Sequence, residues 1–368
     1  MKFNKLVLSL SLAALATSCG LTGGYNITGK ADNSADGDSV FLIDGASHQI
    51  IDTTLVSAGV FSFSGDCDTA KFAIIRVDKA ADGSSAACPV YLEKGKISVF
   101  VAARVADNRV HGTNSNDADT ELRKRVNQIV FVIDSLDQMA KDTTLALDVR
   151  KACEQKEDSV YDNQYVAAFT SSARENIGLL VGIHHLDKIA YAVSLPQLEE
   201  LVAKVPGEFH NDGAYIRLAD RVERMKSVDI GKPYVDFAMP SIQGDTLRLS
   251  SLMDGHKVVV IDFWASWCGP CRREMPNMVK AYEMFRDNGL EIVGVSQDAD
   301  GEAWRNAVNE LNMTWPQLSS LKGWDNEAIK IYAINSIPNT VVVKDGIIAA
   351  HQLTGDELIS KLAELLEK

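Results

Sequence analysis

The 368-residue sequence predicts a multidomain protein with an antiparallel β-sandwich-like domain, a central α-helical region and a C-terminal α/β domain. Up to residue 117, short apolar runs are separated by Gly, Asp and Asn turn signals, which is typical of a small antiparallel sandwich. Between residues 118 and 228, apolar side chains recur with the period of about 3.6 residues that amphipathic helices require. From residue 229 onwards, apolar strand patterns alternate with helical patterns, as in an α/β sheet.

Residues 1–18 have the pattern of a secretory signal peptide. An apolar run over 6–16 follows two lysines, and its length of about eleven residues is too short to span a bilayer. Small residues then precede Cys19, as in the lipoprotein box of bacterial envelope proteins, where the cysteine becomes the lipidated first residue. We therefore expect a periplasm-facing protein anchored in the cell envelope by a lipid at Cys19. The alternative is ordinary secretion with cleavage near the same residue.

Residues 19–117 form the expected β-rich domain. Cys67 and Cys88 both fall within it, and their spacing leaves open whether they form a disulfide or are small buried hydrophobic residues. The strands are expected over 39–43, 60–64, 72–77, 90–93 and 97–102.

Residues 118–228 form the expected helical region. An apolar stripe from Leu122 to Leu136 predicts its first helix, and Pro206-Gly207 predicts a break. Further helices are expected over 145–169, 171–186, 195–205 and 214–226.

Residues 229–368 form the expected α/β domain. We expect a hairpin over 236–239 and 246–249, strands over 258–263, 290–296, 340–343 and 347–352, and helices after the first of these strands and over 302–311, 322–332 and 355–366.

Two cysteines with two residues between them follow the apolar strand over 258–263. Cys268 and Cys271 stand where this strand gives way to a helix, and the free N–H groups and partial positive charge of a helix N-terminus favour a thiolate. We therefore predict a redox pair in which Cys268 is the attacking thiol and Cys271 the resolving thiol. A zinc site is not expected, because no cysteine follows Cys271 and the only later histidine is His351.

Asp262 is the one charged residue of the apolar strand. Burial of a carboxylate is costly unless it is paired or serves a function, and burial raises its pKa. We therefore expect Asp262 to be a base that deprotonates Cys271.

The net charge of −13 disfavours nucleic acid as a partner, because nucleic-acid binding needs a basic surface that releases counterions. An acidic balance in a secreted protein is explained by solubility alone. No cofactor is expected beyond the Cys268–Cys271 disulfide itself.

The segment Trp267-Cys268-Gly269-Pro270-Cys271, with Glu274 and Pro276 in the following helix, resembles the TlpA/ResA-like thiol-disulfide oxidoreductases of the thioredoxin superfamily. The resemblance continues through 294–298, Ile337-Pro338 and Asp345-Gly346 and covers about residues 229–368. It implies a thioredoxin-like fold with a cis bond at Ile337-Pro338 beside the cysteines. It also implies that Trp267, Gly269, Pro270, Ile337 and Pro338 contact substrate, and that Glu274 either tunes the thiols or merely complements the helix dipole.

The segments 59–65 and 111–118 resemble the uncharacterised β-domain that precedes TlpA-like domains in Bacteroidetes-type lipoproteins. This resemblance implies no chemistry for the β-domain.

The resemblance around the cysteines implies a disulfide reductase that acts on protein disulfides through a mixed disulfide and is re-reduced by a membrane electron donor. One alternative is a thiol peroxidase of the AhpC/TSA type, although the Pro-x-x-x-Thr-x-x-Cys context of those enzymes is absent. Another alternative is a binding or assembly lipoprotein in which the β-domain binds a partner and the redox domain is auxiliary.

Overall fold

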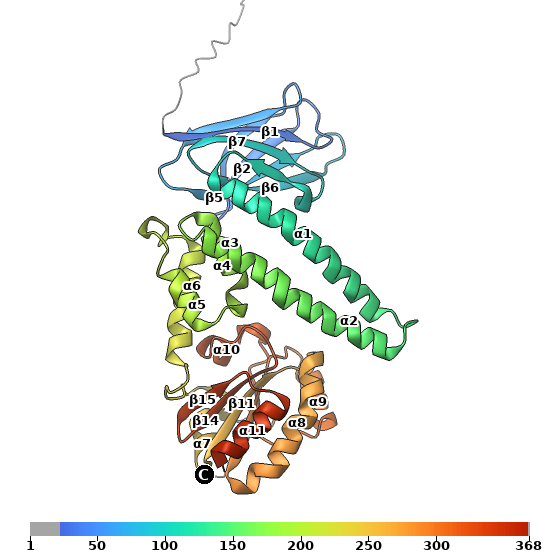
Figure 1. Ribbon diagram of the computed structural model, residues 1–368, viewed down its shortest axis with the longest axis vertical. Coiled ribbons are helices and arrows are strands. Elements are labelled where there is room, and N and C mark those ends of the chain that lie inside the picture. Colours follow the sequence, from blue (N-terminus) through green and yellow to red (C-terminus); the bar gives the residue numbers. More distant parts are fainter. Residues whose placement is uncertain (1–22, 367–368) are drawn as a thin grey trace, which may run out of the picture. The chain divides into compact units, whose positions relative to one another are not determined.

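A computed structural model describes residues 23–366 of the chain. They divide into two compact units, one running up to Ala168 together with Leu179–Gly182, and the other comprising Phe169–Gly178 and the residues from Ile183 onwards (Figure 1). The expected signal peptide and Cys19 lie outside the described residues. Within 23–366, no helix has both the length and the apolar composition needed to cross a membrane.

The first unit contains a β-sandwich of two four-stranded sheets, which confirms the predicted β-rich domain. Residues of both sheets, such as Ile27, Ile97, Leu42 and Ile75, are buried in one shared hydrophobic core. Along β5, buried and less buried side chains alternate, as the period of two in a strand requires. One sheet has the order β4-β1-β7-β8 and the other β3-β2-β5-β6. The strands are β1 Gly24–Ala31, β2 Ser39–Asp44, β3 Ile50–Leu55, β4 Phe61–Asp66, β5 Lys71–Asp78, β6 Ser85–Leu92, β7 Gly95–Val101 and β8 Arg109–His111.

Cys67, Cys88 and Cys153 are free and buried. Cys67 donates to the carbonyl oxygens of Leu92 and Thr69, each at 3.1 Å. Burial raises the pKa of Cys88 to about 12. The interpretation of Cys67 and Cys88 as small buried hydrophobic residues is therefore the one that holds.

The segment 111–118 contains the start of helix α1, Asn114–Lys141. Asn116 is buried and bonds to both backbone groups of Tyr91, accepting from its nitrogen at 2.9 Å and donating to its oxygen at 2.7 Å. Asp117 accepts from the backbone nitrogen of Gly112 at 3.1 Å. These bonds fix α1 to strand β6, so the motif has a structural role in joining the helix to the sandwich.

The helical region follows the predicted pattern, with two differences. The helix expected over 145–169 changes at Tyr161–Val166 to π-helical geometry. The helix expected over 171–186 is interrupted after Glu175, where Gly178 weakens helix formation. The helices are α2 Leu147–Val160, α3 Ala167–Glu175, α4 Leu180–Ile189, α5 Leu195–Val202 and α6 Gly213–Ser227.

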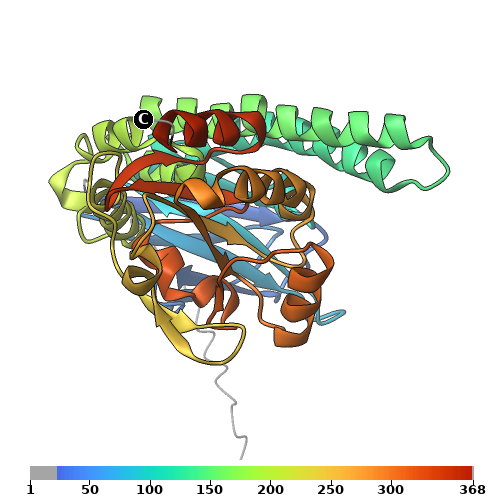
Figure 2. The same ribbon diagram turned by 90° about the horizontal axis from the view of Figure 1, so that it is seen from below.

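The second unit contains a five-stranded sheet with the order β13-β12-β11-β14-β15, seen from another side in Figure 2. Strands β11, β12 and β13 are parallel, and β14 and β15 complete the sheet in antiparallel fashion. Helices α8, α9 and α11 cover one face, while α7, α10 and the β9–β10 hairpin cover the other, which confirms the predicted α/β fold. The strands are β9 Ala238–Pro240, β10 Thr246–Arg248, β11 Val258–Trp264, β12 Leu290–Ser296, β13 Gln317–Ser319, β14 Asn339–Lys344 and β15 Ile347–His351; the helices are α7 Leu249–Met253, α8 Gly269–Phe285, α9 Gly301–Glu310, α10 Glu327–Ile331 and α11 Gly355–Leu366.

The helix expected over 322–332 is shorter in the structure. Gly323 has a φ of 56°, in the left-handed region, and the side chain of Asn326 accepts from the nitrogen of Ala328 as the N-cap of α10. Helix α10 therefore begins only at Glu327, and residues 323–325 form a 3₁₀ turn.

Two arginines of α6 bind the C-terminal end of α10 within the second unit. Arg221 is buried and donates to the carbonyl oxygens of Ala333 and Ala190, both at 3.1 Å. Arg224 donates to the carbonyl oxygen of Lys330 at 3.4 Å. Burial lowers the pKa of Arg221 to about 10, so its charge is kept at neutral pH and is compensated by the carbonyl groups of Ala333 and Ala190, which follow the C-terminal ends of α10 and α4.

We expect Arg221→Met to lower the free energy of unfolding by about 2 kcal/mol, because hydrogen bonds to a buried charge are lost and two carbonyl groups lose a donor. Chemical denaturation measures this change. Arg217→Met is the matched control, since Arg217 lies on the same helix in an exposed ion pair with Asp187 and should cost no more than about 1 kcal/mol. Equal stability of the two variants would contradict the assignment.

Candidate functional site

Cys268 and Cys271 form a disulfide at the start of α8, with an S–S distance of 2.04 Å. Cys268 is the N-cap of the helix, and its Sγ accepts from the backbone nitrogen of Cys271 at 3.1 Å. Cys268 retains 5% of its surface and Cys271 none, so Cys268 is the sulfur that a partner can reach. This difference matches the attacking and resolving roles expected from the sequence.

The residues around Cys268 form an exposed rim. Trp267 is 58% exposed, and Gly269 and Pro270 are also exposed in the first turn of α8. The Ile337–Pro338 bond is cis, as expected, and the carbonyl oxygen of Ile337 lies 3.8 Å from the Sγ of Cys268. The structure thus brings the five predicted substrate-contacting residues to the same end of the sheet.

Asp262 lies on β11 and is 2% exposed. Side chains alternate along a strand, so Asp262 points to the same face as Val260 and Trp264. Both of these share a hydrophobic cluster with Cys271, so Asp262 lies in the layer beneath the redox helix. Burial, with a smaller contribution from the charge of Glu274, raises the pKa of Asp262 to about 7. A carboxyl group that titrates near neutral pH can both accept and return a proton there.

Glu274 lies one turn after Cys271 and joins two helices. One carboxylate oxygen accepts from the backbone nitrogen of Gly355 at 2.6 Å, at the start of α11. The other accepts from Nδ2 of Asn277 at 3.0 Å. These bonds place a negative charge at a helix N-terminus, and the charge also acts on Asp262.

Ser266 and Asp298 were not identified from the sequence. The carboxylate of Asp298 accepts from the nitrogen of Ser266 at 2.9 Å and from its hydroxyl at 2.5 Å, and a further bond of 2.7 Å comes from the hydroxyl of Ser296. These bonds hold the segment before Cys268 to the end of β12. An acidic residue two positions after a core strand was the available signal, since the carboxyl ends of parallel strands meet at one edge of a sheet.

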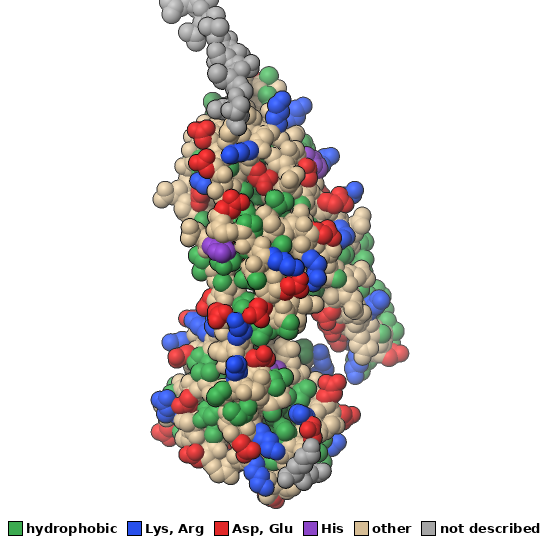
Figure 3. All heavy atoms as spheres, turned by 60° about the vertical axis from the view of Figure 1, so that its left-hand side comes forward, with side chains coloured by type: hydrophobic (Ala, Val, Ile, Leu, Met, Phe, Trp, Pro, Cys, Tyr) green, Lys and Arg blue, Asp and Glu red, His purple; other side chains and the backbone are tan. Residues whose placement is uncertain are grey.

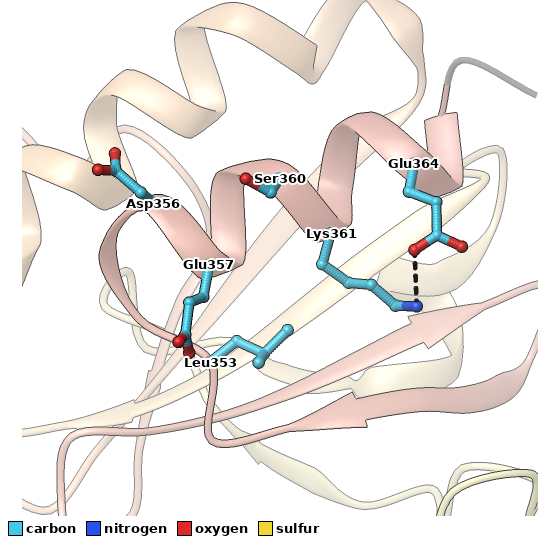
Figure 4. Close-up of a pocket in the computed structure, with 6 residues that line it drawn as sticks. All are labelled: Leu353, Asp356, Glu357, Ser360, Lys361 and Glu364. Atoms are coloured by element: carbon cyan, nitrogen blue, oxygen red, sulfur yellow. Dashed lines mark hydrogen bonds and ion pairs between the residues drawn. The ribbon is translucent and has the colours of Figure 1, made fainter.

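A pocket of about 480 Å³ lies along α11, and neither cysteine lines it. Figure 4 shows these residues, with Lys361 and Glu364 joined at 3.0 Å. The redox pair itself lies on a surface rim, which suits a protein substrate better than an enclosed small molecule. On the face shown in Figure 3, acidic and basic side chains lie intermixed over both units. The pocket is lined by Leu353, Asp356, Glu357, Ser360, Lys361 and Glu364.

Residues 230–351 match the model of the AhpC/TSA family, and residues 25–118 match a domain of unknown function (DUF4369). A thiol-disulfide oxidoreductase ResA of Bacillus thuringiensis subsp. konkukian is 28% identical over 144 residues, which is 39% of this chain and 80% of that protein. The C-terminal domain is a ResA-like thiol-disulfide oxidoreductase of the thioredoxin superfamily. The expected resemblance of the ResA-like domain and of the β-domain is thereby confirmed.

Other relatives match the same ResA-like domain. The ResA of Oceanobacillus iheyensis is 34% identical over 119 residues, which is 31% of this chain and 59% of that protein. The thioredoxin domain of a thiol-disulfide oxidoreductase from Bacteroides vulgatus is 30% identical, with a TM-score of 0.36, and 38% of this chain matches 99% of that one. A thiol-disulfide oxidoreductase from Bacteroides fragilis is also 30% identical, with a TM-score of 0.35, and 37% of this chain matches all of that one (100%).

Proposed function

We propose that the protein is a disulfide reductase of the bacterial cell envelope, facing the periplasm and anchored by a lipid at Cys19. The disulfide at the start of α8, with Cys268 at an exposed rim and Cys271 buried above Asp262, is the observation that supports this proposal. The substrates are disulfide-bonded proteins, and no cofactor besides the Cys268–Cys271 pair takes part.

In the first step the Cys268 thiolate attacks one sulfur of the substrate disulfide. A mixed disulfide forms, and the other substrate sulfur leaves as a thiolate that takes up a proton. Asp262 then accepts the proton of Cys271, whose sulfur attacks that of Cys268. The second substrate thiol is released, and the Cys268–Cys271 disulfide remains. Two electrons have passed to the substrate, and a membrane dithiol donor restores the reduced pair.

The reducing direction is supported by charge. Asp262 shares the layer beneath the redox helix and Glu274 lies one turn after Cys271, and negative charge near a buried thiol disfavours its thiolate. An environment that disfavours the thiolates favours the disulfide, which lowers the reduction potential. Gly269-Pro270 between the cysteines is also the pair found in reducing thioredoxins, as the resemblance implies.

The reduction potential of the Cys268–Cys271 pair tests this direction. We expect a value near the thioredoxin value of about −270 mV after equilibration of the soluble full chain with defined thiol buffers. A reduction potential of about −120 mV, as in strong oxidants, would make the protein an oxidase instead. Absence of any two-electron transition would remove the redox proposal and favour a binding role for the β-domain. Consumption of peroxide with thiol turnover would favour the peroxidase alternative.

A further inference from the structure

The chain has five tryptophans, all of them in the C-terminal domain. Trp264, Trp304 and Trp315 are buried, with at most 3% of their surface exposed. The other two are exposed, Trp267 by 58% and Trp324 by 45%. Exposed tryptophans that gather on one surface are a common mark of an interaction site.

Both exposed tryptophans follow strands of the parallel part of the sheet. Trp267 follows β11, and Trp324 follows β13 in the segment 320–326. The carboxyl ends of β11, β12 and β13 share one edge, which is the edge that carries Cys268. Leu321 in the same segment is 40% exposed. The axes of β11 and β13 lie two strand spacings apart, or about 10 Å, which is the length of about three extended residues.

The segment 320–326 is fixed to the centre of that edge. The side chain of Asn326 donates to the carbonyl oxygen of Ser296 at 3.4 Å and to Oε1 of Gln297 at 3.2 Å. The nitrogen of Leu321 donates to the hydroxyl of Ser319 at 3.1 Å, and that hydroxyl donates to the oxygen of Ser296 at 3.2 Å.

Residues 296–298 at the end of β12 also bind the residue next to Trp267. Asp298 binds Ser266, the residue before Trp267, at 2.9 Å and 2.5 Å. Leu321 has a φ of 54°, a left-handed conformation that is uncommon for a branched side chain and persists where surrounding bonds impose it. Residues beside both exposed tryptophans are therefore hydrogen-bonded to the short segment 296–298, which fixes the backbone that carries the tryptophans before any partner binds.

We propose that Trp267, Leu321 and Trp324 form a docking surface for an extended apolar segment that flanks the reacting cysteine of a substrate protein. Trp324 contacts an aliphatic or aromatic side chain about three positions from that cysteine, as the spacing of the strands indicates. The occupant is a disulfide substrate because Trp267 also belongs to the rim around Cys268, where any substrate disulfide has to arrive. This inference rests on the proposed disulfide reductase function.

The test compares Trp324→Ala with wild type in the full chain without its signal peptide. Three probes are used: a peptide disulfide with leucine three positions from its cysteine, the same peptide with serine there, and dithiobis(nitrobenzoate) as a small disulfide. We expect Trp324→Ala to lower kcat/KM for the leucine peptide about tenfold. The serine peptide, the small disulfide and the reduction potential should be unchanged. Trp324→Phe should restore most of the rate with the leucine peptide.

Met284→Ala is the matched control, because Met284 is 50% exposed in the last turn of α8, at the end opposite the cysteines. Equal loss with all three probes, or no loss with the leucine peptide, would overturn the docking surface. A concentration-dependent dimer that disappears in Trp324→Ala would assign the surface to a second copy of the chain instead. If the wild-type protein reduces none of the three probes, the reductase proposal itself fails.

Discussion

Replacement of Cys271 by serine is expected to stop turnover and to trap the substrate on the enzyme. Cys268 keeps its place as the N-cap of α8 and can still attack, but the sulfur that resolves the mixed disulfide is gone. Because serine is close to cysteine in size, the buried position remains filled. Cys268→Ser, which lacks the attacking sulfur, should neither turn over nor form a mixed disulfide. Non-reducing electrophoresis and mass spectrometry of the two variants after incubation with a disulfide substrate measure the difference.

Cys153→Ser is the control for these variants, since Cys153 is a free and buried cysteine on helix α2. It should turn over at the wild-type rate. Full turnover by Cys271→Ser, or a mixed disulfide in Cys268→Ser, would refute the assigned roles of the two sulfurs.

Asp262→Asn is expected to raise the free energy of unfolding at neutral pH and to slow turnover. The pKa of Asp262 is raised from 3.8 to about 7, so the folded protein holds a proton that the unfolded chain has released over this range. The free energy of unfolding therefore falls as the pH rises from about 4 to about 7. This rise in pKa corresponds to about 4 kcal/mol of unfolding free energy at most. The asparagine variant should be more stable than the wild type by up to that amount above pH 7, and no more stable near pH 3.

The same substitution removes the base that we assign to Cys271, so turnover at pH 7 should fall by about 100-fold. The pH dependence of turnover near pH 7 should disappear with it. Asp236→Asn is the control, and its effect on stability at neutral pH should have the opposite sign. Burial raises the pKa of Asp236, but hydrogen bonds from Ser250 and Arg248 outweigh that effect and lower it, so this variant should lose stability at neutral pH and keep its turnover. Equal stability of wild type and Asp262→Asn at pH 8, or unchanged turnover, would contradict the role of Asp262.

Local patterns predicted many of the elements that bury one regular face, although strands β1 and β8 were missed. Strand β11 and helix α8 are examples, because a continuous apolar run and a 3.6-residue apolar stripe each specify one structure. Strand β3 was missed, since Ile50, Ile51 and Leu55 are all more than 40% exposed and no alternation marks a buried face. Strand β13 has only three residues, too few for any period to be recognised.

The redox chemistry of Cys268 and Cys271 could be predicted from the sequence, whereas the long-range hydrogen bonds that support the fold around them could not. Cys268 and Cys271 are neighbours in sequence, so their spacing alone brings them together. The bonds of Ser266 to Asp298 and of Arg221 to Ala333 join residues 32 and 112 positions apart. Contacts of this kind depend on the order of the strands and on helix packing, which no local pattern specifies.

The position of β1 within its sheet limits how far the proposed lipid anchor could let the protein reach. Strand β1 is an inner strand, paired with β4 on one side and β7 on the other, so it cannot peel away without disrupting the sheet. It begins at Gly24, five positions after Cys19, and a fully extended tether of that length measures at most about 17 Å. With a lipid at Cys19, the sandwich would therefore stay within about 17 Å of the membrane surface. Any greater distance between the redox pair and the membrane has to come from the part of the chain that follows the sandwich.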